Sequence, residues 1–327
     1  VFQFNLAHGK LTDLEHAEKL SEYQEHLHKA DLGYAFRKQD HDEATIVDPH
    51  DSTKTIPNPH LSTADMDFAG NFRTPWVPLS SSYFKRIVPC VSFIIASGTR
   101  VCFYSWDERI SDTKSPNEVL SCLHHWMLSE KVKKPNLKKF ILWCDNCAGQ
   151  CWNQMMIRFI HEVCSPLSPL YIEGIERVEV KSSVSGHTYM WCDRVIGPIK
   201  IIARKEVGGI VANFINPPDR EELPEQYHTR TWESCIRRAK IGNVHYELKV
   251  CEGTFFDGFK EYWDGGEEKR SIFFHPKQSQ SMKYYDPDPE ISDEKFQISK
   301  VHWMSAGCSE NPYYGPNSSA PPMVQHP

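Results

Sequence analysis

Residues 138–145 read Lys-Lys-Phe-Ile-Leu-Trp-Cys-Asp, an apolar run that begins after two lysines and ends before an aspartate. Such a run is typical of a strand that is buried on both faces in the middle of a parallel sheet. Ligands gather at the carboxyl ends of parallel strands, so Asp145 lies where a site is expected. This octapeptide therefore predicts an α/β fold and supplies its first candidate site residue.

Three strand signals and a helix signal precede this run. Residues 61–68 form a short possible strand. Residues 88–96 and 100–106 are rich in β-branched and aromatic residues and flank a Ser-Gly-Thr turn, which predicts a β-hairpin. Residues 115–118, Ser-Pro-Asn-Glu, are a capping box with proline at the first helical position, and an apolar stripe at helical spacing follows.

Alternating helix and strand signals follow the run. Apolar residues at helical spacing cover 152–163, a strand is expected at 178–180, and a third helix at 195–203 contains Gly197-Pro198. The order strand, hairpin, helix, strand, helix, strand, helix predicts a mixed sheet built from a β-hairpin and βαβ units. That is the order of the ribonuclease-H-like fold, in which the first and fourth strands are neighbours.

We divide the chain into four parts: a helical arm and linker (1–60), a ribonuclease-H-like domain (61–206), a C-terminal α+β extension (207–311) and a disordered tail (312–327). Thr12 to Glu15 form a capping box, and the helix that it starts is expected to end near Gly33. Residues 38–60 show no periodicity and read as a linker. The tail contains five prolines.

Composition excludes several classes of protein. Of 327 residues, 40% are hydrophobic and 12% are aromatic, which is enough apolar material for a core. No apolar run approaches the ~20 residues that span a bilayer, and no signal peptide is visible. The eleven cysteines cannot all pair within one chain, and several lie in apolar periodic segments. We therefore expect a nuclear or cytoplasmic protein, not a secreted or membrane one.

Charge is unevenly distributed along the chain. The net charge is -6, but residues 61–205 carry 18 basic and 13 acidic side chains between two acidic flanks. The middle block could face a polyanion such as DNA. A surplus of this size is equally consistent with ordinary surface variation.

Three aspartates form the candidate site. Asp67 closes the first predicted strand, Asp145 follows the fourth, and Asp193 stands at the start of the third helix. If the first and fourth strands are neighbours, Asp67 and Asp145 point into one crevice, over which Asp193 could close. Three carboxylates on rigid elements suit a pair of Mg²⁺ (or Mn²⁺) ions that catalyse phosphoryl transfer. Any one of these aspartates alone is as consistent with a strand end or a helix cap.

Several segments carry a resemblance to a known family: 67–75, 82–86, 106–108, 117–123, 143–153, 185–193 and 227–239. The most specific are Asp-Asn-Cys-Ala-Gly-Gln, which begins at Asp145, and Gly186-His187-Thr188. Together they resemble a family of uncharacterised proteins encoded in animal mobile elements. That family is regarded as integrase- or transposase-like, with a ribonuclease-H-like core and a three-acid DDE/DDD site.

The resemblance implies Mg²⁺-dependent cleavage and transfer of DNA strands, with Asp67, Asp145 and Asp193 as metal ligands. Asp65 is a rival for the first position, but Asp67 keeps the family's spacing to the following Thr-Pro. The alternative is a catalytically inactive transposase-derived module that binds DNA or protein. Pro198 favours this alternative, because a kink in the third helix could displace Asp193. A homo-oligomer is possible in either case.

Three polar residues are candidate auxiliaries. His187, six residues before Asp193, could contact a phosphate or orient that carboxylate. Asn146 and Gln150 could bind the carboxylates or a nucleic-acid backbone. All three are equally compatible with turn and cap positions. In the family the position of Cys151 is usually asparagine.

Two cysteine sites and one lysine cluster compete with the three-acid site. Cys144, Cys147 and Cys151, with Cys192 or His187, have a spacing that is compatible with zinc, although buried thiols are favoured. A Cys147 nucleophile with His187 as base would need an oxyanion hole that we cannot identify. A lysine cluster could bind nucleic-acid phosphates or simply be a solvated loop; its members are Lys131, Lys133, Lys134, Lys138 and Lys139.

Overall fold

The computed structural model describes residues 13–70, 72–74, 88–107, 110–111, 114–145, 147, 149–182, 190–215, 229–240, 242–252, 255–256 and 303–307. The helices are α2 (Asp13–Glu43), α4 (Pro116–Lys133), α5 (Gln154–Cys164), α6 (Trp191–Ile215) and α7 (Thr229–Arg238). The strands are β1 (Thr45–Asp48), β2 (Asp51–Pro57), β3 (Leu61–Phe68), β4 (Phe72–Thr74), β5 (Val88–Ser97), β6 (Arg100–Asp107), β7 (Lys139–Cys144), β8 (Arg177–Ser182), β9 (His245–Val250) and β10 (Trp303–Gly307).

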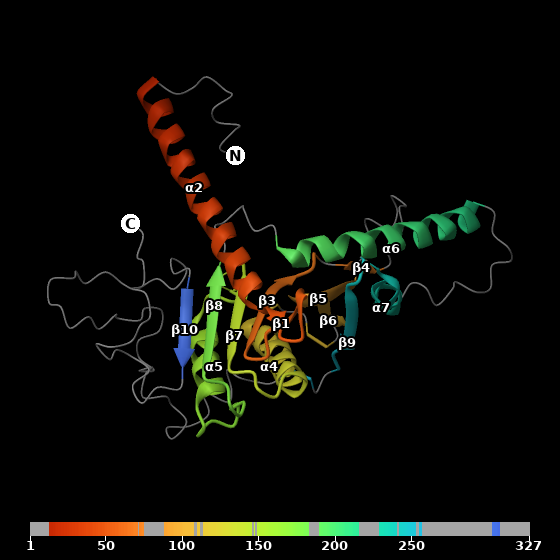
Figure 1. Ribbon diagram of the computed structural model, residues 1–327. Coiled ribbons are helices and arrows are strands. Elements are labelled where there is room, and N and C mark those ends of the chain that lie inside the picture. Colours follow the sequence, from red (N-terminus) through yellow and green to blue (C-terminus); the bar gives the residue numbers. More distant parts are fainter. Residues whose placement is uncertain are drawn as a thin grey trace, which may run out of the picture.

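An eight-stranded mixed sheet organises the protein (Figure 1). Its order is β10-β8-β7-β3-β5-β6-β9, and β4 pairs with β5. β3 is parallel to β7 and β7 to β8, whereas β5 is antiparallel to both β3 and β6. The predicted α/β class and the hairpin of β5 and β6 are confirmed. The first and fourth predicted strands, β3 and β7, are neighbours, as expected.

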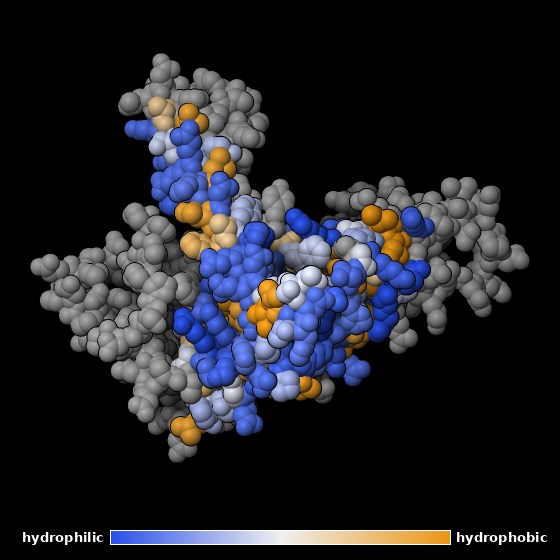
Figure 2. All heavy atoms as spheres, viewed as in Figure 1, coloured by the Kyte–Doolittle hydropathy of each residue, from blue (hydrophilic) through white to orange (hydrophobic). Residues whose placement is uncertain are grey.

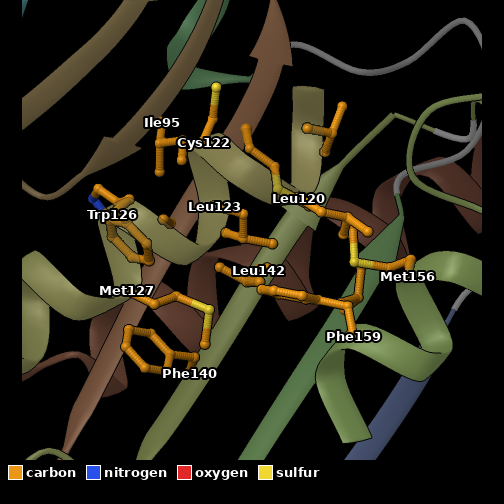
Figure 3. Packing of buried hydrophobic residues seen from close by; sticks show 14 of the residues in the cluster. Ile95, Leu120, Cys122, Leu123, Trp126, Met127, Phe140, Leu142, Met156 and Phe159 are labelled. Carbon is orange, nitrogen blue, oxygen red and sulfur yellow. The ribbon is translucent and has the colours of Figure 1, made fainter. Parts of the chain in front are cut away.

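Helices α4 and α5 cover one face of this sheet and build the larger core. Figure 3 shows their apolar side chains interleaved with Phe140 and Leu142 of β7. Glu118 is buried, and its carboxylate accepts the backbone N–H of Ser115 at 2.8 Å, which completes the predicted capping box. The apolar residues that follow this capping box at helical spacing form the face of α4 that packs on the central strands.

Helices α6 and α7 cover the opposite face over β5 and β6. Ile199 of α6 and Cys235 and Ile236 of α7 are fully buried there with Ile94 of β5. Pro198, at which a kink was expected, lies inside α6, and the helix continues through it. Proline removes one helical hydrogen bond, and the packing of the flanking apolar turns on the sheet offsets that loss.

The N-terminal region departs from the prediction. The helix does not end near Gly33, because α2 continues to Glu43. Glycine costs only about 1 kcal/mol inside a helix, and the last turns of α2 dock on the sheet. Residues 45–57, expected to be linker, form the hairpin of β1 and β2. Side chains of β1 alternate between exposed and half-buried, and those of β2 are mostly exposed, so the apolar signal is weak.

The remainder of α2 extends away from the sheet (Figure 1). Its surface in Figure 2 is largely hydrophilic with a few apolar side chains. Two large apolar side chains of α2 are exposed, Leu32 at 44% and Phe36 at 57%. Because polar residues occupy most sides of α2, its sequence shows no clear apolar stripe at helical spacing.

Both edges of the sheet come from beyond residue 206. β9 pairs in parallel with β6, and β10 pairs antiparallel with β8. The region predicted as a C-terminal extension therefore shares a sheet with the predicted domain. The predicted tail, 312–327, lies outside the described residues.

No helix in the described part of the chain is both long and apolar enough to cross a membrane.

Candidate functional site

Asp67 and Asp145 lie at the carboxyl ends of adjacent parallel strands. Asp65 of β3 pairs in register with Trp143 of β7; Asp67 lies two residues further along β3, and Asp145 lies two residues after Trp143, directly after the end of β7. Met66 and Cys144 point into the α4–α5 core. Because side chains alternate along a strand, the two acids share the other face, which α6 covers in part. The predicted adjacency of the two strands is confirmed.

Asp193 is the third residue of α6 and lies within electrostatic reach of this pair. Its carboxylate accepts the backbone N–H of Met190 at 3.1 Å. Burial, repulsion from Asp145 and, more weakly, repulsion from Asp193 raise the pKa of Asp67 to about 7. The backbone N–H of Phe68, at 2.7 Å from Asp67 Oδ1, opposes this rise. Three carboxylates, those of Asp67, Asp145 and Asp193, therefore lie at one edge of the sheet, which we call the acid edge, with Asp145 and Asp193 within electrostatic reach of Asp67.

A tight turn after β7 holds Asp145. The carbonyl of Cys147 accepts the backbone N–H groups of Gln150, Cys151 and Trp152 at 3.0–3.1 Å. The buried indole of Trp152 donates its Nε1–H to the carbonyl of Asp145 at 3.1 Å. Burial raises the pKa of the Asp145 carboxyl. The turn thus fixes the backbone of Asp145 and leaves its carboxylate on the same face of the sheet as that of Asp67.

Asn153 joins this turn to α5. Its side-chain oxygen caps the helix by accepting the backbone N–H of Met156 at 3.0 Å. Its side-chain nitrogen donates to the carbonyl of Gln150 at 3.0 Å. The conspicuous Gly-Gln-Cys-Trp-Asn sequence is therefore used to end one strand and start the next helix.

The three acids suit a divalent cation in chemistry and charge. Carboxylate oxygens are the donors that Mg²⁺ prefers, and a cation would relieve the repulsion that raises the pKa of Asp67. Among the described residues, however, no three His, Cys, Asp or Glu side chains converge closely enough to hold a metal ion. Binding would therefore require the carboxylates to draw together, with Asp193 turning from the N–H of Met190.

Lys114 lies beside Asp67 and was not found by sequence reasoning. Its Nζ lies 5.1 Å from the centre of the Phe68 ring, and its charge lowers the pKa of Asp67. Burial in turn lowers the pKa of Lys114. In the sequence Lys114 stands directly before the Ser115 cap of α4, which gave no signal that it would lie beside Asp67.

Asp65, the rival first acid, has other partners. Its side chain is 2% exposed. One carboxylate oxygen lies 2.9 Å from Nε2 of His41, and the other accepts the backbone N–H of Trp191 at 2.9 Å. These contacts join Asp65 to α2 and α6, so Asp67 is the better candidate for a ligand.

The predicted auxiliaries are only partly placed. His187 and Asn146 lie outside the described residues. Gln150 is described, and its backbone belongs to the turn after β7.

The lysine cluster lies at the other end of the sheet, around the end of α4 and the start of β7. Lys133 contacts Glu247 at 3.3 Å, and Lys134 donates to the carbonyl of Leu61 at 3.2 Å. Lys138 pairs with Glu176 and Lys139 with buried Glu179, both at 2.7 Å. Lys131 donates to the carbonyl of Leu137 at 2.9 Å. The structure therefore does not bring these lysines to the acids.

The cysteines are divided between the two faces of the sheet. Cys144 and Cys151 lie in the α4–α5 core, whereas Cys192 lies in the α6–α7 core. Burial and the contact with Cys151 raise the pKa of Cys144 well above its ordinary value, which disfavours a thiolate ligand. Burial and nearby Asp145 also raise the pKa of Cys147, contrary to an activated nucleophile. All described cysteines are free thiols, and all except Cys147 are buried.

The acid edge thus combines carboxylates that suit a cation with a lysine that suits a phosphate. Comparison of the chain with protein-family models, with curated proteins and with solved structures finds no match.

Proposed function

We propose that this chain is a ribonuclease-H-like domain that cleaves and transfers DNA strands by Mg²⁺- or Mn²⁺-assisted phosphoryl transfer, in the manner of a transposase or integrase. The observation that carries the proposal is the electrostatic coupling at the acid edge. Asp67 and Asp145 lie at the ends of neighbouring parallel strands, and the charges of Asp145 and Asp193 add to burial in raising the pKa of Asp67, so three carboxylates from distant parts of the sequence lie near one another. Like charges are costly to gather, and such gathering is typical of functional sites.

The order of the strands supports the fold in this proposal. Five neighbouring strands stand in the sheet in the order β6-β5-β3-β7-β8. If these five are renumbered 1 to 5 along the chain, this order is 3-2-1-4-5. Only the second of these, β5, is antiparallel to the others. This is the arrangement that we expect of a ribonuclease-H-like domain, and it brings the first and second acids onto neighbouring strands.

In this proposal the three aspartates bind the cations and Lys114 binds the DNA. Asp67 and Asp145 would hold cations at the end of the rigid central strands, with Asp193 contributing from the start of α6. Bound divalent cations would supply Lewis acidity and a nucleophilic water or hydroxyl. Lys114, on the same edge, would bind a phosphate oxygen of the DNA.

A second candidate is a transposase-derived module that binds DNA or protein without catalysis. One observation favours it: the carboxylate of Asp193 already accepts the N–H of Met190. Among the described residues no three metal-binding side chains converge.

Calorimetric titration with Mn²⁺, followed by a supercoiled-plasmid nicking assay in Mn²⁺ or EDTA, tests the proposal. We expect Mn²⁺ binding and Mn²⁺-dependent nicking. DNA binding with neither Mn²⁺ binding nor nicking would support the second candidate and exclude the first.

A further inference from the structure

Asp65 makes contacts to two elements that are far from it in the sequence. It lies in the middle strand of the sheet and is almost completely buried. Its carboxylate bridges the ring of His41 in α2 and the backbone N–H of Trp191 in α6, each at 2.9 Å. Its carbonyl lies 3.2 Å from the thiol of Cys192, which completes a second contact with α6.

The contact with Trp191 acts as a helix cap. Trp191 is the first residue of α6, and the first N–H groups of a helix have no partner within that helix. A carboxylate at this position satisfies one such group and interacts favourably with the positive end of the helix dipole. Here the cap comes from a strand of the sheet, so it fixes the start of α6 relative to β3.

The same contact sets the distance between two of the proposed ligands. Asp67 lies two residues after Asp65 on the same face of β3, and Asp193 lies two residues after Trp191. The bond from Asp65 to Trp191 thus links the two elements that carry these acids.

We propose that Asp65 is a positioning residue of the three-acid site, which holds the start of α6 so that Asp193 stays within reach of Asp67 and Asp145. The metal-binding part of this inference rests on the proposed function, whereas the anchoring of α6 does not. Asp65 acts through Trp191 and is not itself a ligand.

Helix α2 supports the anchor from the other side. His41 binds Asp65, and the preceding residue, Asp40, accepts the indole N–H of Trp143 at 2.8 Å and binds Lys181 at 2.9 Å. Consecutive residues of α2 therefore bind β3 and β7 at Asp65 and Trp143, each two residues before a candidate acid.

Two substitutions at Asp65 separate an anchor from a ligand. In Asp65→Asn, the amide oxygen still accepts the N–H of Trp191 and the amide nitrogen can donate to His41, but the charge is lost. In Asp65→Ala both contacts are lost. The readouts are calorimetric Mn²⁺ affinity and hydrogen exchange of a peptide that contains residues 191–199, measured on the full chain.

We expect Asp65→Ala to weaken Mn²⁺ binding by about tenfold or more, the usual effect of losing a residue that supports metal ligands. It should also speed exchange at the start of α6. Asp65→Asn should stay within about threefold of wild type in both measurements, whereas Asp67→Asn should lose Mn²⁺ binding without faster exchange in α6.

If Asp65→Asn loses Mn²⁺ binding as fully as Asp67→Asn, Asp65 is a ligand and the inference is wrong. Wild-type behaviour of Asp65→Ala also overturns it. If Asp65→Ala does not fold, Trp191→Pro replaces it, because proline lacks the N–H that Asp65 accepts and is tolerated at the first helical position; Trp191→Phe controls for the loss of the indole side chain. Failure of wild-type protein to bind Mn²⁺ overturns the proposed function, and the exchange data then decide on the anchor alone.

Discussion

Asp65 and Trp143 face each other in the parallel register of β3 and β7, and consecutive residues of α2 bind their side chains. The N-terminal helix is therefore attached to the sheet directly beside the acid edge. An element that reads as a separate arm in the sequence is part of the support of the site.

Asp145→Asn should abolish Mn²⁺-dependent nicking while the protein remains folded. The amide carries no charge to balance a cation, and the loss of one carboxylate weakens both ions of a pair. Nicking of supercoiled plasmid and circular dichroism measure the two effects. Glu176→Gln, at the opposite end of the sheet, is the matched control and should nick as wild type. Nicking by Asp145→Asn at the wild-type rate would exclude the three-acid site.

Asp67→Asn should stabilise the metal-free protein, and more so at pH 8 than at pH 5. The folded-state pKa of Asp67 is raised from 3.8 to about 7, so its bound proton stabilises the folded state below pH 3.8. That contribution is lost as the pH rises through about 7, and asparagine does not titrate. We expect Tm in EDTA to exceed that of wild type by roughly 2–5 °C at pH 8. An equal difference at both pH values would show that the Asp67 carboxyl has an ordinary pKa.

Lys114→Ala should weaken DNA binding and lower the salt dependence of the affinity by about one phosphate contact. Lys114 is placed beside Asp67, where a phosphate would lie. The matched control is Lys133→Ala, since Lys133 contacts Glu247 at the other end of the sheet. Fluorescence anisotropy at several salt concentrations distinguishes them. A larger loss for Lys133→Ala would place the DNA on the lysine cluster instead.

Asp40→Ala should destabilise the protein by about 2 kcal/mol, because it removes the acceptor of the buried indole N–H of Trp143 and leaves Lys181 with Glu179 in place of two carboxylates. Asp42→Ala, two residues away, removes only an exposed ion pair with Lys38 and should cost less than about 0.5 kcal/mol. Urea denaturation measures both. Equal costs would mean that the end of α2 does not depend on this contact.

Protein purified without added metal should contain no stoichiometric zinc. Cys144 and Cys192 lie in cores on opposite faces of the sheet, so they cannot complete one site. Cys144→Ala should keep the fold and lose about 1 kcal/mol of stability. Elemental analysis checks the first expectation and thermal denaturation the second. One zinc per chain that is lost in Cys144→Ala would reverse this interpretation.

Strands and helices that pack on the central sheet were predictable, because burial on a repeating element leaves a period in the sequence. The run before Asp145 became β7, and the capping box at Ser115 became the start of α4. The placement of Asp67 and Asp145 followed from strand order alone.

Elements whose stability comes from distant partners were not predictable. Gly33 suggested a helix end because a single glycine says nothing of Asp40 and His41, which hold the following turns to the sheet. Pro198 suggested a kink that could displace Asp193, because the apolar packing of α6 against β5 cannot be read locally. The partners of Asp65 are 24 and 126 residues away, so its role was hidden beside Asp67.

The alternation of β3 makes its length as important as its composition. Asp65 and Asp67 face the acid side, while Ala64 and Met66 fill the core beneath α4 and α5. Inserting or deleting one residue inside this strand would exchange the two sets, burying aspartates in the core and exposing its apolar residues. Substitutions in β3 that keep the polarity of each face should therefore be tolerated, whereas a change in the number of residues between Leu61 and Asp67 should not.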